Sequence, residues 1–280
     1  MKIEKYLPNL LTFANLFCGF LGIVSCLNES YFYWPPNDPY AINAMGGNIV
    51  FAGFLVFLGA FFDLFDGMAA RWVKSTSPIG KELDSLTDMV TFGVLPALIL
   101  YDLLLHSHTW WLYSAYIGYT PLGMLLPFLL TAGAAWRLAK FNTDATQSKT
   151  FSGLPTPACA MFFASFPLIM RYSDVLIFKF DVVYISNIIL NPLFLIPLIL
   201  LFSWLMVSKI RLFSLKLNGF SYKNNRFAFN FAAACILIFI IFRWVGVPLI
   251  IMLFIILSIV RKKNLKHGLD GLNDFTEKKE

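Results

Sequence analysis

Residues 48–71 read NIVFAGFLVFLGAFFDLFDGMAAR, an apolar run that ends with two aspartates and an arginine. A helix needs about 20 predominantly apolar residues to cross the hydrocarbon core of a bilayer, and residues 48–70 meet that requirement. A carboxylate within such a helix costs roughly 2.5–3.5 kcal/mol to insert, so we expect Asp63 and Asp66 to serve a function. This stretch therefore predicts a membrane protein and the position of its site.

The composition of the whole chain agrees with a membrane protein. Of its 280 residues, 58% are hydrophobic and 14% are charged, whereas soluble domains have about 45–50% apolar and about 25% charged residues. This apolar excess excludes a disordered chain, a collagen-like repeat and an ordinary soluble fold. The formal net charge is +6. Because the basic residues lie between apolar runs, we expect membrane topology rather than a nucleic-acid partner to explain this charge.

Apolar runs of suitable length predict an all-α protein, a polytopic transmembrane helical bundle of about eight spans. The expected spans cover residues 8–27, 48–70, 87–105, 111–136, 154–171, 187–207, 227–243 and 246–261. Gly246 and Pro248 indicate that the last two spans form a tight helical hairpin or one re-entrant element. We expect three regions: a transmembrane domain with the site over 1–210, an additional C-terminal transmembrane hairpin over 211–262, and a charged cytoplasmic tail over 263–280.

The distribution of basic residues predicts the orientation of the chain. With eight spans both termini lie on one side of the membrane, and 19 of the 22 Lys and Arg residues then lie on that side. Because Lys and Arg accumulate in cytoplasmic loops, we expect cytoplasmic termini and a place in the inner cell membrane. A lipoprotein-like cleavage before Cys26 is the alternative for the first span. At about 20 residues, that span is longer than the roughly 7–15 apolar residues of a secretory signal.

Four carboxylates are expected at the cytoplasmic ends of two consecutive antiparallel helices. Asp63 and Asp66 end one span, and Asp84 and Asp88 open the next. Residues three or four positions apart share a helix face, so each pair presents its carboxylates on one side. Oxygen ligands without nearby Cys or His favour Mg²⁺ or Mn²⁺, and two such ions suit phosphoryl transfer. The alternative is that the acids cap helices or pair with basic neighbours.

Two residues beside the aspartates suit a phosphate-bearing substrate. Gly67 has no side chain, so a substrate can approach the helix backbone there. Arg71 lies one turn later and can donate charge-assisted hydrogen bonds to a phosphate. Both residues favour phosphoryl chemistry at the acidic cluster.

The run Asp63-x2-Asp66-Gly67-x2-Ala70-Arg71-x8-Gly80-x3-Asp84-x3-Asp88 resembles, at every fixed position, the signature of the CDP-alcohol phosphotransferase family. Five further stretches are similar to the integral-membrane phosphatidylserine synthases. They are PNLLT at residues 8–12, NLFCG at residues 15–19, LDSLTDMVTFG at residues 83–93, RLAKFN at residues 137–142 and FSGLPTP at residues 151–157. The resemblance covers residues 5–165 and continues beyond them only as a hydrophobic pattern.

This resemblance implies an enzyme that transfers the phosphatidyl group from CDP-diacylglycerol to L-serine and produces phosphatidylserine and CMP. It implies that Asp88 is the general base and that Gly67 and Arg71 contact the cytidine nucleotide. The residues that it implies as ligands of the divalent cations are Asp63, Asp66, Asp84 and Asp88. Homodimers are common in the family, so a second copy of the chain is a candidate partner besides the lipid bilayer.

Further candidate residues flank the signature. Ser77 is a candidate phosphate contact. Asn9 and Thr12 are candidate neighbours of the nucleotide, for which capping of the helix start is the alternative. The residues whose chemistry suits a serine carboxylate or a lipid phosphate are Arg137, Lys140 and Asn142. For this group the alternative is anchoring at the cytoplasmic face. Lys140 stands where the resemblance predicts Arg, which disfavours bidentate binding there.

Two alternative functions remain open. The same chemistry with another alcohol, glycerol 3-phosphate or an inositol phosphate, is one, although a phosphorylated acceptor requires more basic residues than the neighbouring loop contains. A cation-coupled transporter is the other, because transporters also use carboxylates in the membrane. A transporter is expected to have them near the bilayer midplane, often with internal repeats. The expected position at the cytoplasmic edge and the lack of a visible repeat favour the transferase.

Overall fold

The computed structural model describes residues 7–28, 47–73, 78–107, 115–117, 120–143, 153–172, 182–210 and 226–260. Within these ranges the chain is helical apart from two short antiparallel strands, β1 (Tyr116–Ile117) and β2 (Thr120–Pro121). Five helices in the described part are long and apolar enough to cross a membrane. The expected all-α membrane architecture is therefore confirmed, whereas the count of eight spans stays a prediction.

The five candidate spans cover Leu7–Leu27, Asn48–Ala70, Ile79–Leu105, Leu122–Thr143 and Ala228–Val260. The first two spans are α1 (Leu7–Asn28) and α2 (Gly47–Val73). The third is a continuous helix made of α3 (Pro78–Asp88), η4 (Met89–Val94) and α4 (Leu95–Leu105), and the fourth combines η6 (Leu122–Leu125) with α5 (Phe128–Thr143). The fifth contains α9 (Arg226–Phe242), η10 (Arg243–Val245) and residues 246–260. Three further helices are shorter: α6 (Thr156–Tyr172), α7 (Val182–Ile189) and α8 (Pro192–Val207).

The third helix begins earlier than the sequence predicted. Its first residue is Pro78 rather than a residue near position 87, so Asp84 and Asp88 lie inside the helix and do not open it. Proline is favourable in the first helical turn, where its missing amide hydrogen is not needed. Because the residues of α3 are mostly polar, they form no apolar run, and the sequence pattern did not predict this extension. At Met89 the backbone changes to the π-helical stretch η4, directly after Asp88.

Two other spans differ from their predicted limits. The predicted span 111–136 is displaced, because residues 115–117 and 120–121 are not α-helical and α5 continues to Thr143. Residues 111–114 and 118–119 lie outside the described residues. The predicted span 187–207 is broken between α7 and α8. Asn191 has an extended backbone, as expected for a residue before proline, and its Oδ1 accepts a hydrogen bond from Leu193 N at 2.9 Å.

The C-terminal helices form two arms joined by a turn. Arg243 has a positive φ of 49° at the turn. Beyond it, a Cβ atom on Gly246 would lie 2.9 Å from the carbonyl oxygen of Ile238, so the two arms approach closely there. The rings of Phe231 and Phe254 lie 6.1 Å apart. The structure therefore shows two adjacent helical arms, and the choice between a transmembrane hairpin and a re-entrant element stays a prediction.

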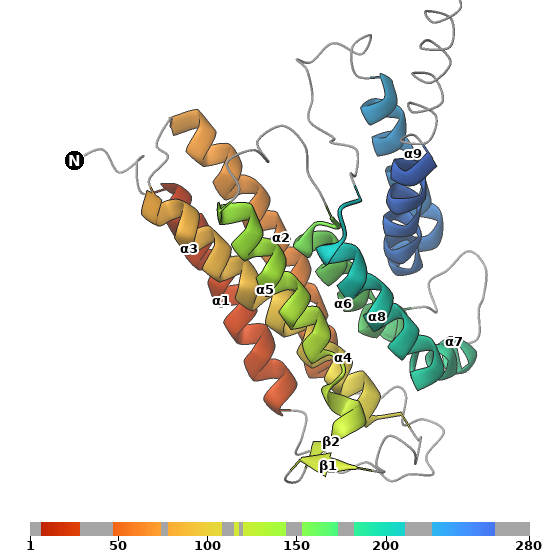
Figure 1. Ribbon diagram of the computed structural model, residues 1–280. Helices are drawn as coiled ribbons and strands as arrows, with labels where there is room; N and C mark the ends of the chain where they lie inside the picture. The colour runs from red at the N-terminus through yellow and green to blue at the C-terminus, as the bar shows by residue number, and fades with distance from the viewer. Residues whose placement is uncertain are drawn as a thin grey trace, which may run out of the picture.

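The helix ends determine where a site can form. Figure 1 shows the start of α1, the end of α2 and the start of α3 gathered at one end of an elongated bundle, with β1 and β2 at the opposite end. Helix α1 packs along α2 and also contacts α3 and η4, and α2 contacts η4. Helix α6 supports α2 from the other side, and α5 packs against α8. A stacked pair of rings, Phe162 and Phe202, with centroids 4.2 Å apart, joins α6 to α8 in the core.

Candidate active site

Three carboxylates from two helices meet at one end of the bundle. Asp63 and Asp66 on α2 and Asp84 on α3 each have a carboxylate oxygen within 4.8 Å of the other two. Asp66 is only 6% exposed, and the other two are half-buried. The spacing of three residues places the first pair on one face of α2. The predicted acidic cluster is therefore present.

The cluster has the chemistry of a site for a hard divalent cation. Asp84 Oδ1 is buried and has no hydrogen-bond partner, and burying such an atom without a partner is unfavourable. Magnesium binds oxygen ligands at about 2.0–2.1 Å, so ligands on opposite sides of an ion lie about 4.2 Å apart. The three carboxylate oxygens lie within 4.8 Å of one another, so one ion can contact all three after small side-chain movements. These residues therefore fit a divalent cation.

Thr12 on α1 contacts the cluster directly. Its Oγ1 lies 2.9 Å from Asp66 Oδ2 and 3.0 Å from the carbonyl oxygen of Pro8. A hydroxyl group has a single proton, so it donates to one of these acceptors at a time. Thr12 lies inside α1 and does not cap its start, which excludes the capping alternative for this residue. Asn9, one turn earlier, is half-buried.

Asp88 lies one turn after Asp84 and outside the group of three carboxylates. Its side chain is 9% exposed and lies within electrostatic reach of the other three aspartates and of Arg137 on α5. Asn15 Nδ2 donates a hydrogen bond to Asp88 Oδ1 at 3.4 Å. Of the four predicted cation ligands, the structure thus brings three together and places the fourth beside them.

The backbone next to Asp66 is accessible at Gly67. A Cβ atom built on Gly67 would have no neighbouring atom within 4 Å, which agrees with the expected approach of a substrate at this position. The backbone of Arg71 continues α2, but its side chain lies outside what the structure describes. Ser77 also lies outside the described residues.

The predicted acceptor residues on α5 have different surroundings. Arg137 lies within electrostatic reach of Asp88, and its Nε is buried without a hydrogen-bond partner. Lys140 is half-buried. Asn142 instead joins α5 to α3: its Nδ2 donates to Ser85 Oγ at 2.9 Å and to Glu82 Oε2 at 3.2 Å. The structure thus directs Arg137 toward the acidic cluster and gives Asn142 contacts between helices.

The contacts of Asn142 predict a stabilising role. We expect Asn142→Ala to lower the free energy of unfolding by about 1–3 kcal/mol, because Ser85 Oγ and Glu82 Oε2 lose a donor. Thermal unfolding in detergent measures this change. Thr143→Ala is the matched control, since among the described residues the Thr143 hydroxyl bonds to carbonyl groups of its own helix, at Ala139 and Lys140. Loss of substrate binding at unchanged stability would instead indicate that Asn142 contacts the acceptor.

Sequence reasoning missed two polar residues near Asp88. Asn15 on α1 is completely buried, and Thr91 on η4 is buried as well. Thr91 Oγ1 donates to the backbone oxygen of Asn15 at 3.1 Å. A signal was present, because Asn15 is polar within an apolar span and lies three residues after Thr12, on the same helix face.

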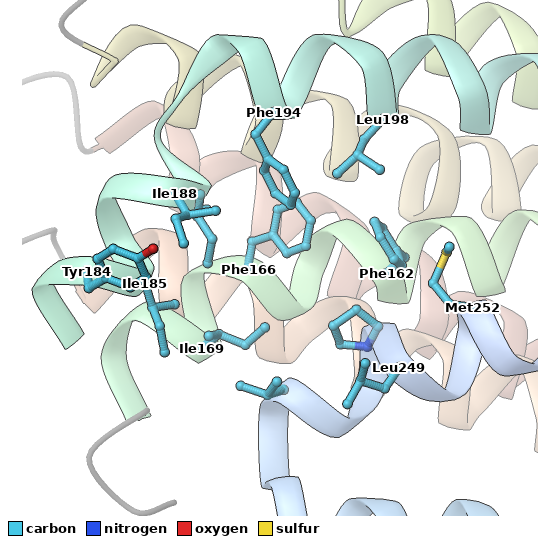
Figure 2. A pocket seen from close by; sticks show the side chains of 13 residues that line it. Phe162, Phe166, Ile169, Tyr184, Ile185, Ile188, Phe194, Leu198, Leu249 and Met252 are labelled. Atoms are coloured by element: carbon cyan, nitrogen blue, oxygen red, sulfur yellow. The ribbon is translucent and has the colours of Figure 1, made fainter. Parts of the chain in front are cut away.

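An apolar cavity lies away from these carboxylates. It has a volume of about 460 Å³ and lies between α6, α7, α8 and the C-terminal hairpin (Figure 2). Its lining includes Phe166, Ile188 and Leu249, and the Tyr184 hydroxyl is the one polar side-chain group among the lining residues. A cavity without an acid or a base cannot transfer a proton or hold a cation. The acidic end of the bundle is therefore the candidate active site.

An apolar helical bundle with clustered carboxylates at one end defines an integral membrane protein with a candidate divalent-cation centre. A model of the CDP-alcohol phosphatidyltransferase family matches residues 5–205. Because this match covers most of the chain, the protein belongs to that family. The matched region contains α1 to α7 and most of α8 and therefore every residue of the acidic cluster.

Named relatives agree with this family. The chain is 34% identical over 157 residues to a CDP-diacylglycerol–serine O-phosphatidyltransferase of Bacillus subtilis. The aligned residues cover 56% of this chain and 72% of the relative. It is 34% identical over 168 residues to the Saccharomyces cerevisiae protein of the same name, covering 56% of this chain and 51% of the relative. It is 30% identical over 177 residues to an archaetidylserine synthase of Methanothermobacter thermautotrophicus, and the aligned residues cover 62% of this chain and 63% of the relative. The chain thus spans between half and three quarters of these relatives.

Proposed function

We propose that the protein transfers the phosphatidyl group of CDP-diacylglycerol to the hydroxyl of L-serine and releases CMP. The observation that carries this proposal is the group of Asp63, Asp66 and Asp84, with Asp88 one turn away, in a chain of the CDP-alcohol phosphatidyltransferase family. Two of the relatives described above are named as CDP-diacylglycerol–serine O-phosphatidyltransferases, which supports serine as the acceptor.

The four aspartates have two proposed roles. Asp63, Asp66, Asp84 and Asp88 hold the divalent cation, Mg²⁺ or Mn²⁺. When bound, the cation neutralises charge on the pyrophosphate of the donor. Asp88 accepts the proton of the serine hydroxyl. The serine oxygen then forms a bond to the phosphorus that carries diacylglycerol, the bond from that phosphorus to the CMP oxygen breaks, and its electron pair leaves with CMP.

The donor is proposed to bind along α1 and α2. Gly67 lets the nucleotide approach the helix backbone. Arg71 and Ser77 contact its phosphates, because a guanidinium and a hydroxyl donate hydrogen bonds to phosphate oxygens. Thr12 orients Asp66 through the 2.9 Å contact, and Asn9 lies one turn away, beside the nucleotide.

The acceptor is proposed to bind between Asp88 and α5. Arg137 is a suitable group for the serine carboxylate or the lipid phosphate, because its guanidinium is within electrostatic reach of Asp88. Lys140 lies on the same helix three residues later and supplies a second positive charge. Asn142 contributes indirectly, through the position of α3.

We further propose eight spans, with both termini and the active site on the cytoplasmic side of the inner membrane. The excess of basic residues on one side supports this orientation. Such a site lets the acyl chains of the donor stay in the bilayer while its nucleotide reaches water. We assign residues 1–210 to the catalytic domain, 211–262 to an additional hairpin and 263–280 to a cytoplasmic tail. A homodimer is the proposed assembly.

The two alternative functions predict different behaviour. A different acceptor alcohol requires no change in the acidic cluster. A transporter is expected to have its carboxylates near the bilayer midplane, whereas Asp63 and Asp66 lie in the C-terminal half of α2, and Asp84 lies in the N-terminal part of the continuous helix that begins at Pro78. The family match also favours a transferase, and serine remains the proposed acceptor.

The direct test uses purified protein with CDP-diacylglycerol, a divalent cation and a panel of alcohols. We expect CMP release with serine, loss of release when a chelator removes the cation, and recovery with Mg²⁺ or Mn²⁺. Quantifying CMP by chromatography gives the rate with each acceptor and each metal. Release only with another alcohol would contradict the choice of serine, and no release with any alcohol would contradict the transferase.

A further inference from the structure

Asn15 is a polar side chain in the middle of α1 that the proposed mechanism leaves without a role. It is completely buried and lies outside the aspartate signature. We infer that Asn15 is a positioning residue for Asp88, an inference that rests on the function proposed above. The observations that carry it are the contacts of Asn15 and the packing of the three helices around it.

Two hydrogen bonds join Asn15 to the helix of Asp88. Asn15 Nδ2 donates to Asp88 Oδ1 at 3.4 Å, and the backbone oxygen of Asn15 accepts from Thr91 Oγ1 at 3.1 Å. Asp88 and Thr91 lie three residues apart, so they face α1 together. Asn15 is thus held by its backbone while its amide group holds one oxygen of Asp88.

Two glycines make room for this arrangement. A Cβ atom on Gly59 of α2 would lie 2.8 Å from Asn15 Oδ1 and 2.6 Å from Thr91 Cγ2. A Cβ atom on Gly19 of α1 would lie 2.5 Å from Thr91 Oγ1. Helices in membranes approach closely where such small residues meet. The close contact of α1, α2 and η4 at Asn15 therefore depends on glycine at these two positions.

Packing alone does not explain an amide at position 15. Asn15 Oδ1 is buried and has no hydrogen-bond partner, so only part of the amide is satisfied, and an apolar side chain of similar size avoids that penalty. The hydrogen bond to Asp88 is the interaction that an apolar side chain cannot make. A π-helix also begins at Met89, directly after Asp88, and such interruptions of α-helices are frequent at functional sites.

The chemical effect of Asn15 follows from which oxygen it binds. The amide donor occupies Asp88 Oδ1 and fixes the rotation of the carboxylate. Oδ2 is then the oxygen that accepts the proton of the acceptor hydroxyl. Without the amide, the carboxylate can rotate among orientations of which only some are productive, and misplaced catalytic groups lower the rate of the chemical step.

The test compares Asn15→Leu with the wild-type enzyme. We expect kcat per folded enzyme to fall at least tenfold and the KM values for serine and CDP-diacylglycerol to change less than threefold. The thermal unfolding temperature is expected to fall only slightly, because the lost donor to Asp88 Oδ1 is offset by the removal of the unsatisfied Asn15 Oδ1. Thr91→Ser, which keeps the hydroxyl, is expected to retain kcat within threefold of the wild type. Thr91→Val, which removes the hydroxyl, is expected to lower kcat by more than threefold. Ser165→Ala is the matched control, since Ser165 on α6 is as buried as Asn15 and bonds within its own helix.

Two results would overturn the positioning role. One is an Asn15→Leu enzyme with kcat within threefold of the wild type. The other is a loss of kcat that accompanies an equal loss of folded protein, which indicates a purely structural residue. If the wild type releases no CMP, the proposed function fails, and the role of Asn15 is tested by thermal stabilisation with Mn²⁺ instead. The quantity measured is the Mn²⁺ concentration that gives half of the full stabilisation. A threefold rise in this concentration for Asn15→Leu supports the positioning role, and an unchanged concentration refutes that role.

Discussion

Replacing Asp88 with asparagine is expected to leave a folded, membrane-inserted protein whose release of CMP from CDP-diacylglycerol and serine falls by about 100- to 10,000-fold. Asparagine has the shape of aspartate, and its Oδ1 can still accept the hydrogen bond from Asn15 Nδ2. It cannot accept the proton of the serine hydroxyl. Because three other carboxylates lie within electrostatic reach, removing one negative charge also reduces their repulsion. We therefore expect no loss of stability.

The matched control for this substitution is Asp102→Asn. Asp102 is also buried and lies on the same continuous helix, in α4 at its other end. Its carboxylate Oδ2 lies 3.6 Å from His106 Nδ1, away from the acidic cluster. We expect this variant to release CMP at a rate within about threefold of the wild type, since it removes no group placed in the reaction. Turnover of Asp88→Asn within about tenfold of the wild type would exclude Asp88 as the base.

The acidic cluster could be predicted because its information is local. Helical spacing places Asp63 and Asp66 on one face, and a pair of carboxylates in an apolar run is unfavourable without a ligand. The way in which Asp84 approaches this pair depends on the packing of α1 against both α2 and α3, which spacing does not determine. For the same reason, the place of Asp88 beside the group rather than within it became visible only in the structure.

Contacts between distant helices account for what the sequence did not predict. Asn15 is one polar residue within an apolar run, and its partner Asp88 is 73 positions away. Asn142 has a side chain suited to an acceptor, yet its hydrogen bonds with Ser85 join α5 to α3. The early start of α3 was missed because its polar residues resemble a loop, although Pro78 is favourable at a helix start.

Gly153 is the position where a single methyl group is expected to have the largest effect on folding. Its φ is +81°, a conformation that costs an L-residue about 1–2 kcal/mol. A Cβ atom there would also overlap the backbone oxygen of Met206 at the end of α8. No side-chain rotation relieves a clash with backbone, so we expect Gly153→Ala to lower the free energy of unfolding by about 2–5 kcal/mol.

The hydrogen bonds around Gly153 explain why a clash at this residue is expected to disturb the packing of α6 and α2. Gly153 N donates to the carbonyl oxygen of Ile210 at 2.9 Å, and Leu154 N donates to that of Leu205 at 3.1 Å. These bonds join the start of α6 to the end of α8, and α6 supports α2, which carries two of the clustered aspartates. The variant is therefore expected to yield little monodisperse protein and to unfold at a lower temperature in detergent.

Gly67→Ala is the control that separates a general effect of added methyl groups from the effect of the turn. A Cβ atom at Gly67 meets no atom within 4 Å, and alanine is favoured over glycine inside a helix by about 1 kcal/mol. We expect this variant to unfold at or above the temperature of the wild type. If Gly153→Ala has the yield and unfolding temperature of Gly67→Ala, the turn at Gly153 does not hold α6 against α8. The position of α2 must then depend on its packing with α1.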